Sequence, residues 1–412
     1  MIACRKPLVA RRAPLIARGT ALIALGAVAL ALAAGCGGHD APPVPIIHAE
    51  PETIFAGRPL EIPALPCVAA LLLEPVSNTV LYEYNADVRR APASIVKMTL
   101  ELVALKEIEA GRLSLDDSVR ASAWASQIGG SQVYLSEGEV FTVRDLLQAI
   151  AINSANDACV ALAEHLAGAT DGFVMMMNQE VEALGLKDTH YVNVHGLDDT
   201  PGEGNYTTAR DIAQIGREVV RHPLALEWAS TPTAPFRGGK FILHNTNHLV
   251  GRFPGLDGIK TGHTDKAGFC LCASAERQGL RLISVVLGAH SNKERFDDTA
   301  RLLSSGFSTY LTVPICRKGE AAEQEVRLKN ARPEAIRPVA PRDVTLIVSR
   351  PDDRRIEREF VPAENLQAPM AAGSLIGNLR IKSGEKLLAE IPMVSAEDVK
   401  ATGFGAWLRR IF

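Results

Sequence analysis

Apolar residues along the central part of the chain change their spacing twice, and each change marks a different kind of element. Short apolar runs at 67–73 and 79–84 are typical of strands, and Val76-Ser-Asn78 between them is typical of a turn. Apolar positions then recur every three or four residues, which predicts five helices: 94–110, 142–152, 157–167, 171–184 and 208–222. Strand-like runs return at 241–244, 268–273 and 280–287, before a last helical segment at 297–310.

This order of strands, helices, strands and a closing helix predicts an α+β fold for residues 66–312. The first and last strands can pair into one antiparallel sheet with helices on both of its faces. After Val313, prolines recur, and short β runs such as 344–348 and 356–360 alternate with turns. A hairpin is expected around Ser383-Gly384, so residues 313–395 are predicted to form a small, separate β-rich domain.

The first 36 residues have the composition of a secretory signal. No acidic residue precedes Asp40, and the apolar stretch from Thr20 to Ala34 follows five basic residues: Arg5, Lys6, Arg11, Arg12 and Arg18. The stretch is shorter than the ~20 apolar residues that a spanning helix needs. A cleaved signal over residues 1–36 is therefore favoured over a permanent transmembrane anchor.

The end of this segment, Leu32-Ala-Ala-Gly35-Cys36, resembles a bacterial lipoprotein signal, in which the cysteine becomes the lipidated first residue. Ala33 stands where that pattern prefers Leu or Val, and ordinary cleavage nearby is the alternative. We expect a lipid at Cys36. In either case the mature protein is expected to be exported to the periplasm, and the lipid would associate it with the membrane.

Two further segments are expected outside the folded domains. Prolines are frequent over residues 37–65, which predicts a tether between the lipid and the first domain. Residues 396–412 are interpreted as a tail that ends in Gly403–Phe412, where aromatic and aliphatic residues accompany Arg409 and Arg410. This end is either a short amphipathic helix lying on a membrane or a frayed or packed terminal turn.

Net charge and cysteine spacing narrow the classes of function. A formal net charge of -3 gives no basic surplus for nucleic acid. Besides Cys4 and Cys36, five cysteines remain, and their spacing fits no zinc site, so we predict no metal or cofactor: Cys67, Cys159, Cys270, Cys272 and Cys316. Cys270 and Cys272 share a strand face and would bridge poorly. A bridge between Cys67 and Cys316 stays open in an oxidising compartment.

Ser94-Ile-Val-Lys97 opens the first predicted helix, where residues three apart lie on one face. A serine hydroxyl needs a base to become a nucleophile. A lysine can be that base when burial or a neighbouring cation lowers its pKa. The spacing alone is weak, because Ser383-Gly-Glu-Lys386 repeats it in a turn-like setting. We predict Ser94 as the nucleophile and Lys97 as the general base.

Lys260-Thr-Gly262 lies in a glycine-containing stretch, Gly255–Gly268, and is expected on a strand edge. Lys260 would place a second cation near Ser94, and Thr261 would offer its hydroxyl to a substrate carboxylate. Gly262 would let backbone approach the ligand closely. The backbone N–H of His263 would then form an oxyanion hole together with that of Ser94.

Ser154-Ala-Asn156 falls between two predicted helices, where a loop can present side chains. Ser154 is predicted to relay a proton between Lys97 and the leaving amine. Asn156 is predicted to bind the substrate amide and to hold Lys97. The three motifs occur in the order that is typical of β-lactamases and penicillin-binding proteins.

Residues 66–312 resemble the low-molecular-mass penicillin-binding proteins that are D-alanyl-D-alanine carboxypeptidases, peptidase family S11. The resemblance rests on five stretches: 92–98, 152–158, 173–178, 206–211 and 257–269. It implies a β-lactamase/transpeptidase-like catalytic domain that removes the terminal D-alanine of the peptidoglycan stem peptide through an acyl-enzyme on Ser94, with β-lactams as covalent inhibitors. It also implies that Arg295 binds the terminal carboxylate of the substrate. The segment 313–395 resembles, more loosely, the second domain of that family.

The sequence leaves three other functions open. A D,D-endopeptidase would cut crosslinked peptidoglycan with the same machinery. A β-lactamase is disfavoured, because no Glu-x-x-x-Asn stretch is well placed between Ser154 and Lys260. A non-catalytic cell-wall scaffold is the weakest alternative, because every motif residue is intact.

Overall fold

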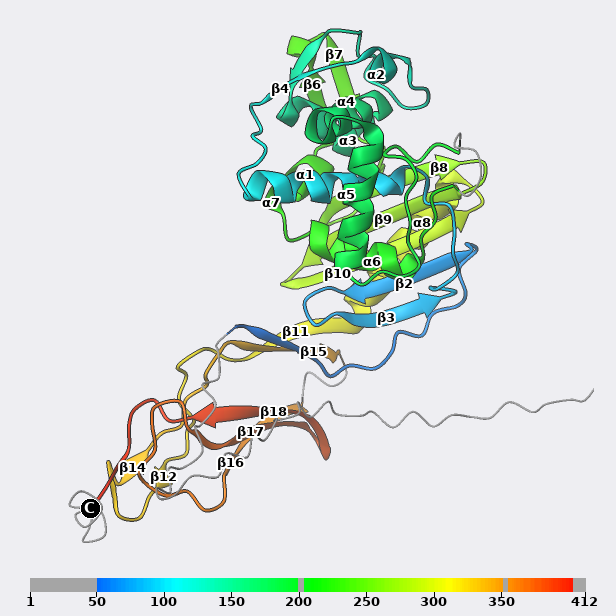
Figure 1. Ribbon diagram of the computed structural model, residues 1–412. Helices are drawn as coiled ribbons and strands as arrows, with labels where there is room; N and C mark the ends of the chain where they lie inside the picture. Colours follow the sequence, from blue (N-terminus) through cyan, green and yellow to red (C-terminus); the bar gives the residue numbers. More distant parts are fainter. Residues whose placement is uncertain (1–49, 199–203, 351–354, 403–412) are drawn as a thin grey trace, which may run out of the picture. The chain divides into compact units, whose positions relative to one another are not determined.

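The computed structural model describes residues 50–198, 204–350 and 355–402 (Figure 1). The predictions for the signal segment 1–36, for Cys36 and for Gly403–Phe412 lie outside these residues. Within them, no helix has both the length and the apolar character that crossing a bilayer requires.

A five-stranded antiparallel sheet forms the centre of the first domain, in the order β3-β2-β10-β9-β8 (Figure 1). Its strands are β2 (Ala69–Glu74), β3 (Thr79–Tyr84), β8 (Leu256–Thr264), β9 (Gly268–Arg277) and β10 (Leu280–Ala289). The N-terminal strand β2 pairs with the C-terminal strand β10, which confirms the predicted closure of the sheet. The α+β fold class is confirmed.

Helices cover both faces of this sheet because side chains alternate along its strands. On β2, Ala69, Leu71 and Leu73 join the larger core, to which the central helices contribute. Ala70 and Leu72 join a second core that includes Leu302 and Leu303 of α8, Phe307 and Tyr310. The helices are α1 (Lys97–Glu109), α2 (Ala123–Gln127), α3 (Val143–Asn153), α4 (Asn156–Ala167), α5 (Thr170–Ala183), α6 (Ala209–Val219), α7 (Pro223–Ala229) and α8 (Asn292–Thr309), with short 3-10 turns η1 (Ala93–Val96) and η2 (Arg237–Gly239).

Local end signals explain where the helices begin and stop. Thr142 and Asp145 form the predicted capping box at the start of α3, with both reciprocal hydrogen bonds present. The helix predicted over 208–222 instead ends at Val219, and Pro223 starts α7 at its first position, where a missing N–H costs nothing. Helix α8 begins at Asn292 rather than at 297, because the side chain of Ser291 caps the N–H of Glu294.

Four short strands complete the first domain in two antiparallel pairs: β4 (Ser118–Arg120) with β5 (Val140–Thr142), and β6 (Thr233–Phe236) with β7 (Phe241–His244). Only β7 was predicted among them. The other three are three or four residues long, too short for an apolar period to be visible.

The C-terminal part is β-rich, as predicted. Its strands are β11 (Tyr310–Cys316), β12 (Val326–Arg327), β13 (Ala331–Arg332), β14 (Ala335–Ile336), β15 (Val344–Ser349), β16 (Ile356–Pro362), β17 (Leu375–Ser383), β18 (Lys386–Val394) and β19 (Lys400–Ala401). The hairpin expected around Ser383-Gly384 is the turn between β17 and β18. Strand β19 pairs with β13, so the folded part extends beyond the predicted boundary at 395.

Residues 52–65, which we expected to form part of a tether, belong to the folded structure. Strand β1 (Glu52–Phe55) pairs in parallel with β15, and β15 also pairs with β11. The Phe55 ring packs edge-on against Tyr310, and Leu60 and Leu65 are buried in the second core. Proline content signalled a linker here, but these apolar side chains supply the burial that a linker lacks.

All five cysteines in the described part of the chain carry free, buried thiols. The bridge considered between Cys67 and Cys316 is not formed, and the two residues belong to different cores.

Candidate active site

Ser94 lies in η1, the short 3-10 turn that directly precedes α1. Lys97 is the first residue of α1. Ala93 has a left-handed φ of 49°, which turns the chain sharply into η1. The Ser94 side chain is half-buried, whereas Lys97 is fully buried. The Nζ of Lys97 lies 3.0 Å from the Oγ of Ser94, as the i,i+3 spacing predicts.

Lys97 Nζ has three further oxygen partners, and they come from the loop between α3 and α4. Nζ lies 2.6 Å from Asn156 Oδ1, 2.7 Å from the backbone oxygen of Ser154 and 3.1 Å from Ser154 Oγ. The two shortest contacts are to carbonyl oxygens, which only accept hydrogen bonds. A neutral amine donates to both of them and keeps its lone pair for a hydroxyl proton. Burial lowers the pKa of Lys97, which favours this neutral form.

The Ser154 loop is held in place by the helix ends on either side of it and by hydrogen bonds from Asn156. Ser154 caps α3 with a left-handed φ of 59°, and α4 begins two residues later, at Asn156. The side-chain amide of Asn156 donates to the backbone oxygen of Gly129 at 2.6 Å, and its backbone N–H donates to Ser131 O at 2.7 Å. Asn156 therefore braces Lys97 against the 129–131 segment.

Strand β8 brings the Lys260-Thr-Gly262 motif to the edge of the sheet, beside η1. Lys260 is fully buried, and its Nζ donates to the backbone oxygen of Thr261 at 3.1 Å. Burial and the positive charge of Lys97 lower the pKa of Lys260 to about 7. The hydroxyl of Thr261 donates to Thr246 Oγ1 at 2.6 Å.

Two glycines leave room for the backbone of Ser94. A Cβ built at Gly262 would stand 2.8 Å from Pro92 O and 3.1 Å from Ser94 N. A Cβ at Gly196 would stand 2.1 Å from Ala93 O, and its φ of 87° also favours glycine. We expected Gly262 to leave space for a ligand, and the structure gives that space to the serine segment. Gly196 was missed, because a single glycine in a loop carries no signal of what packs on it.

Arg295 joins the motif from α8. Its Nη1 donates to the backbone oxygen of Gly262 at 3.0 Å and to that of Cys270 at 3.3 Å. The guanidinium lies 4.8 Å from the ring centroid of Phe296 and is buried, which lowers its pKa to about 10. His263, the residue after the motif, stacks its imidazole on Phe269 with centroids 4.0 Å apart. All nine site residues predicted in the first domain therefore lie in η1, α1, the α3–α4 junction, β8 and α8.

An open groove adjoins the Ser154 loop. Its lining comes from the 130–134 segment, the end of α3, β7 and the turn after β7: Gly130, Ser131, Gln132, Tyr134, Asn153, Phe241, His244, Asn245, Thr246 and His248. Thr246 connects this groove to the hydroxyl of Thr261. The groove therefore borders the Lys260-Thr-Gly262 motif, although none of the motif residues lines it.

Two protein-family models match the chain, one after the other along its sequence. The D-alanyl-D-alanine carboxypeptidase model of peptidase S11 matches residues 58–291, and the C-terminal domain of penicillin-binding protein 5 matches residues 310–401. The chain belongs to the S11 family of D-alanyl-D-alanine carboxypeptidases. The two matches cover most of the first domain and the β-rich C-terminal part.

Individual relatives of this S11 carboxypeptidase cover most of its length. D-alanyl-D-alanine carboxypeptidase DacF of Bacillus subtilis is 35% identical over 346 residues, which are 83% of this chain and 88% of the relative. DacA of Escherichia coli is 35% identical over 355 residues, 83% of this chain and 87% of the relative. The crystal structure of penicillin-binding protein 5 from Haemophilus influenzae superposes with a TM-score of 0.70 at 30% identity, covering 82% of this chain and 99% of that one.

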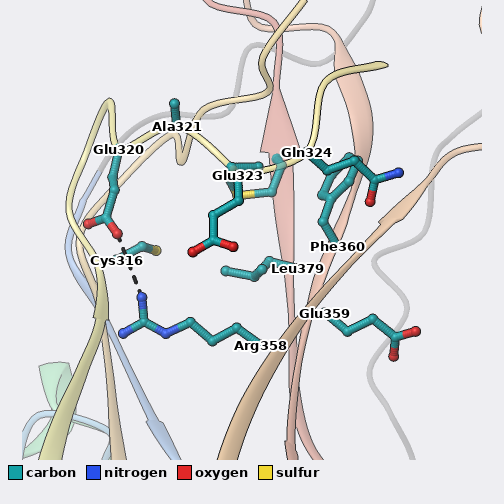
Figure 2. A pocket seen from close by; sticks show the side chains of 11 residues that line it. Cys316, Glu320, Ala321, Glu323, Gln324, Arg358, Glu359, Phe360 and Leu379 are labelled. Carbon is teal, nitrogen blue, oxygen red and sulfur yellow. Dashed lines mark ion pairs between the residues drawn. The ribbon is translucent and has the colours of Figure 1, made fainter. Parts of the chain in front are cut away.

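The β-rich domain of this carboxypeptidase has a pocket of its own, shown in Figure 2. Leu379, Phe360 and Met393 form its apolar part, and Glu320 pairs with Arg358 at 3.6 Å on one side. Glu323 turns its carboxylate toward the space above Leu379. None of the motif residues lines this pocket.

Proposed function

We propose that the chain removes the terminal D-alanine from peptidoglycan stem pentapeptides through an acyl-enzyme on Ser94. The observation that carries this proposal is the fully buried Lys97 amine, 3.0 Å from Ser94 Oγ and held by Ser154 and Asn156. A serine with a buried, neutral amine at hydrogen-bond distance is an activated nucleophile.

In the acylation step, Ser94 Oγ attacks the carbonyl carbon of the penultimate D-alanine, and its proton passes to Lys97 Nζ. The oxygen of the tetrahedral intermediate accepts from the backbone N–H groups of Ser94 and His263. Donors fixed in advance toward such an oxygen are typically worth about 3–4 kcal/mol to the transition state. The tight packing of Gly262 and Gly196 on the serine segment supports this arrangement, because it keeps Ser94 N in one position.

The carbon–nitrogen bond then breaks, and the departing D-alanine amine takes a proton from Lys97 through the hydroxyl of Ser154. The 3.1 Å distance between Lys97 Nζ and Ser154 Oγ supports this relay. In the second half of the reaction, water attacks the acyl carbon and gives a proton to Lys97 Nζ; the bond between that carbon and Ser94 Oγ then breaks, and Lys97 returns the proton to Oγ. The products are a tetrapeptide stem and the free Ser94 hydroxyl.

The terminal carboxylate of the substrate is assigned to Lys260, Thr261 and Arg295. Lys260 and Arg295 supply positive charge, and the hydroxyl of Thr261 supplies a hydrogen bond. Asn156 receives two roles, as a brace for Lys97 and as a partner for the substrate amide; its 2.6 Å contact with Lys97 Nζ supports the first.

The test uses Ser94→Ala together with Ser383→Ala, which changes the serine of the same Ser-x-x-Lys spacing in the β17–β18 turn. Labelling by a fluorescent penicillin and D-alanine release from a pentapeptide are measured for both variants. We expect Ser94→Ala to lose both and Ser383→Ala to match the wild type. Labelling of Ser94→Ala at the wild-type level would contradict the proposal.

We further propose that the protein is exported with residues 1–36 as its signal and is held at the membrane by a lipid on Cys36. The basic and apolar segments that precede Cys36 support this, and an enzyme of the cell wall must reach its substrate outside the cytoplasm. Cys36→Ser should abolish incorporation of labelled fatty acid and move the protein from the membrane to the soluble fraction. If Cys36→Ser remains on the membrane, removal of 403–412 shows whether the C-terminal tail holds it there.

A further inference from the structure

Glu101 is a buried carboxylate that the reaction described above does not use. It lies on α1, one helical turn after Lys97, and only 3% of its surface is exposed. Its Oε1 has no hydrogen-bond partner among the residues that the structure describes. Burying a carboxylate without full hydrogen bonding is costly, so its presence needs a reason beyond packing.

The surroundings of Glu101 contain the two lysines of the site. The charged and titratable groups that act on these three side chains are Lys97 on α1, Lys260 on β8, Asp157 and Cys159 on α4, and Arg295 on α8. The carboxylate of Asp157 already has hydrogen-bond partners, because it accepts from the backbone N–H groups of Val133 and Leu135. Glu101 is thus the carboxylate left to balance the buried lysines.

The electrostatic influence runs in both directions. Burial raises the pKa of Glu101 to about 7, against the opposing effect of Lys260 and Lys97. In return, the negative charge of Glu101 raises the pKa of both lysines, and Lys260 still titrates near 7. Without Glu101, burial and mutual repulsion would drive both lysines further toward the neutral form.

We propose that Glu101 is a positioning residue for the Ser94 reaction, whose buried negative charge keeps Lys260 protonated for the substrate carboxylate while Lys97 remains free to accept a proton. The inference rests on the roles proposed above for Lys97 and Lys260. The carboxylate acts through the two lysines. Its loss therefore changes the pH at which each lysine loses its proton, and the groups that touch the substrate stay the same.

The sign of the effect follows from this arrangement. The acid limb of the pH–rate profile of acylation marks the loss of the proton from Lys97, and the alkaline limb marks its loss from Lys260. Removing the charge of Glu101 lowers the pKa of both groups. Both limbs should therefore move to lower pH.

The test compares acylation by a chromogenic β-lactam, as a function of pH, in the wild type, Glu101→Gln and Glu107→Gln. Glu107 is the matched control, because it lies on the same helix and its carboxylate pairs with Arg112 at the surface. We expect Glu101→Gln to shift both limbs down by about one pH unit. The profile of Glu107→Gln should overlie that of the wild type.

A second pair of variants separates charge from packing. Glu101→Met removes the charge with an apolar side chain of similar length and should shift the limbs as Gln does, even if Glu101→Gln fails to fold. Glu101→Asp keeps the charge and should leave the limbs near the wild-type positions. Unmoved limbs in the folded Gln or Met variant would overturn the inference, even with a lower maximal rate. A wild type that is not acylated would overturn the role of Ser94 as well.

Discussion

The backbone of Gly262 lies directly against the amide nitrogen of Ser94. A methyl group at position 262 would stand 3.1 Å from that nitrogen and 2.8 Å from Pro92 O, so the strand that carries Lys260 also fixes the position of the serine segment. The two halves of the site, far apart in sequence, are thereby held in one geometry.

This contact predicts that Gly262→Ala slows acylation without unfolding the protein. The added methyl group pushes Ser94 N away from the position proposed for the oxyanion, and loss of one such donor costs about 10²–10³ in rate. Stopped-flow acylation with a β-lactam measures the effect. Gly129→Ala is the control, because a Cβ at Gly129 meets nothing within 4 Å. Equal rates in the two variants would show that the close packing of Gly262 has no consequence for the reaction.

Asn156→Asp is expected to slow acylation at pH 7 by about tenfold or more and to move the acid limb of the pH profile upward. The new carboxylate stands where Oδ1 lies 2.6 Å from Lys97 Nζ, so it raises the pKa of Lys97 and keeps that amine protonated. The matched control is Asn153→Asp, which also loses an amide donor to a backbone oxygen, that of Gln132, at 3.1 Å. An acid limb that stays at the wild-type position in Asn156→Asp would contradict the assignment of Asn156.

The sequence predicted most of the first domain, because its signals are local. Thr142 and Asp145 predict the start of α3, because the capping box that they form spans only four residues. The errors arose where tertiary contacts decide the outcome. We predicted that residues 52–55 belong to a proline-rich linker. They form a strand instead, because they pair with the edge of β15 and Tyr310 packs on Phe55.

The candidate site divides in the same way. Residues within motifs, such as Ser94, Lys97 and Lys260, are recognisable by order and spacing. Gly196 and Glu101 are not, because one is a lone loop glycine and the other a lone helical glutamate in the sequence. Their meaning appears only when folding places Gly196 against Ala93 and buries Glu101 near two lysines.

Lys260→Met is expected to stabilise the fold at pH 6 while reducing acylation. The folded-state pKa of Lys260 is about 7, below the value of 10.5 for a free lysine, so the folded state binds this proton less tightly than the unfolded state does. The destabilisation is therefore complete below pH 7 and vanishes as the pH rises from 7 to about 10.5.

Thermal unfolding of Lys260→Met and wild type at several pH values measures this difference. The melting temperature of the variant should exceed that of the wild type at pH 6, and the gap should close by pH 10. Lys293→Met serves as the control, because 82% of that side chain is exposed and its loss should give no such trend. A gap that is constant with pH would mean that packing, and not the buried charge, sets the stability.

Arg295→Gln is expected to weaken the preference for substrates that end in a free carboxylate. Arg295 already donates to the backbone oxygens of Gly262 and Cys270, and burial lowers its pKa only to about 10, so it stays charged at neutral pH. Its positive charge is thus fixed behind the Lys260-Thr-Gly262 strand. Hydrolysis of a D-alanyl-D-alanine peptide is compared with hydrolysis of the same peptide amidated at its end.

The wild type should strongly prefer the free carboxylate, and Arg295→Gln should lose about tenfold of that preference, the value of one charge-assisted hydrogen bond. Arg301→Gln, on the same helix, should leave the preference unchanged. If Arg295→Gln slows both peptides equally, Arg295 acts by holding Gly262 and the end of β8 in place, and the carboxylate belongs to Lys260 and Thr261 alone.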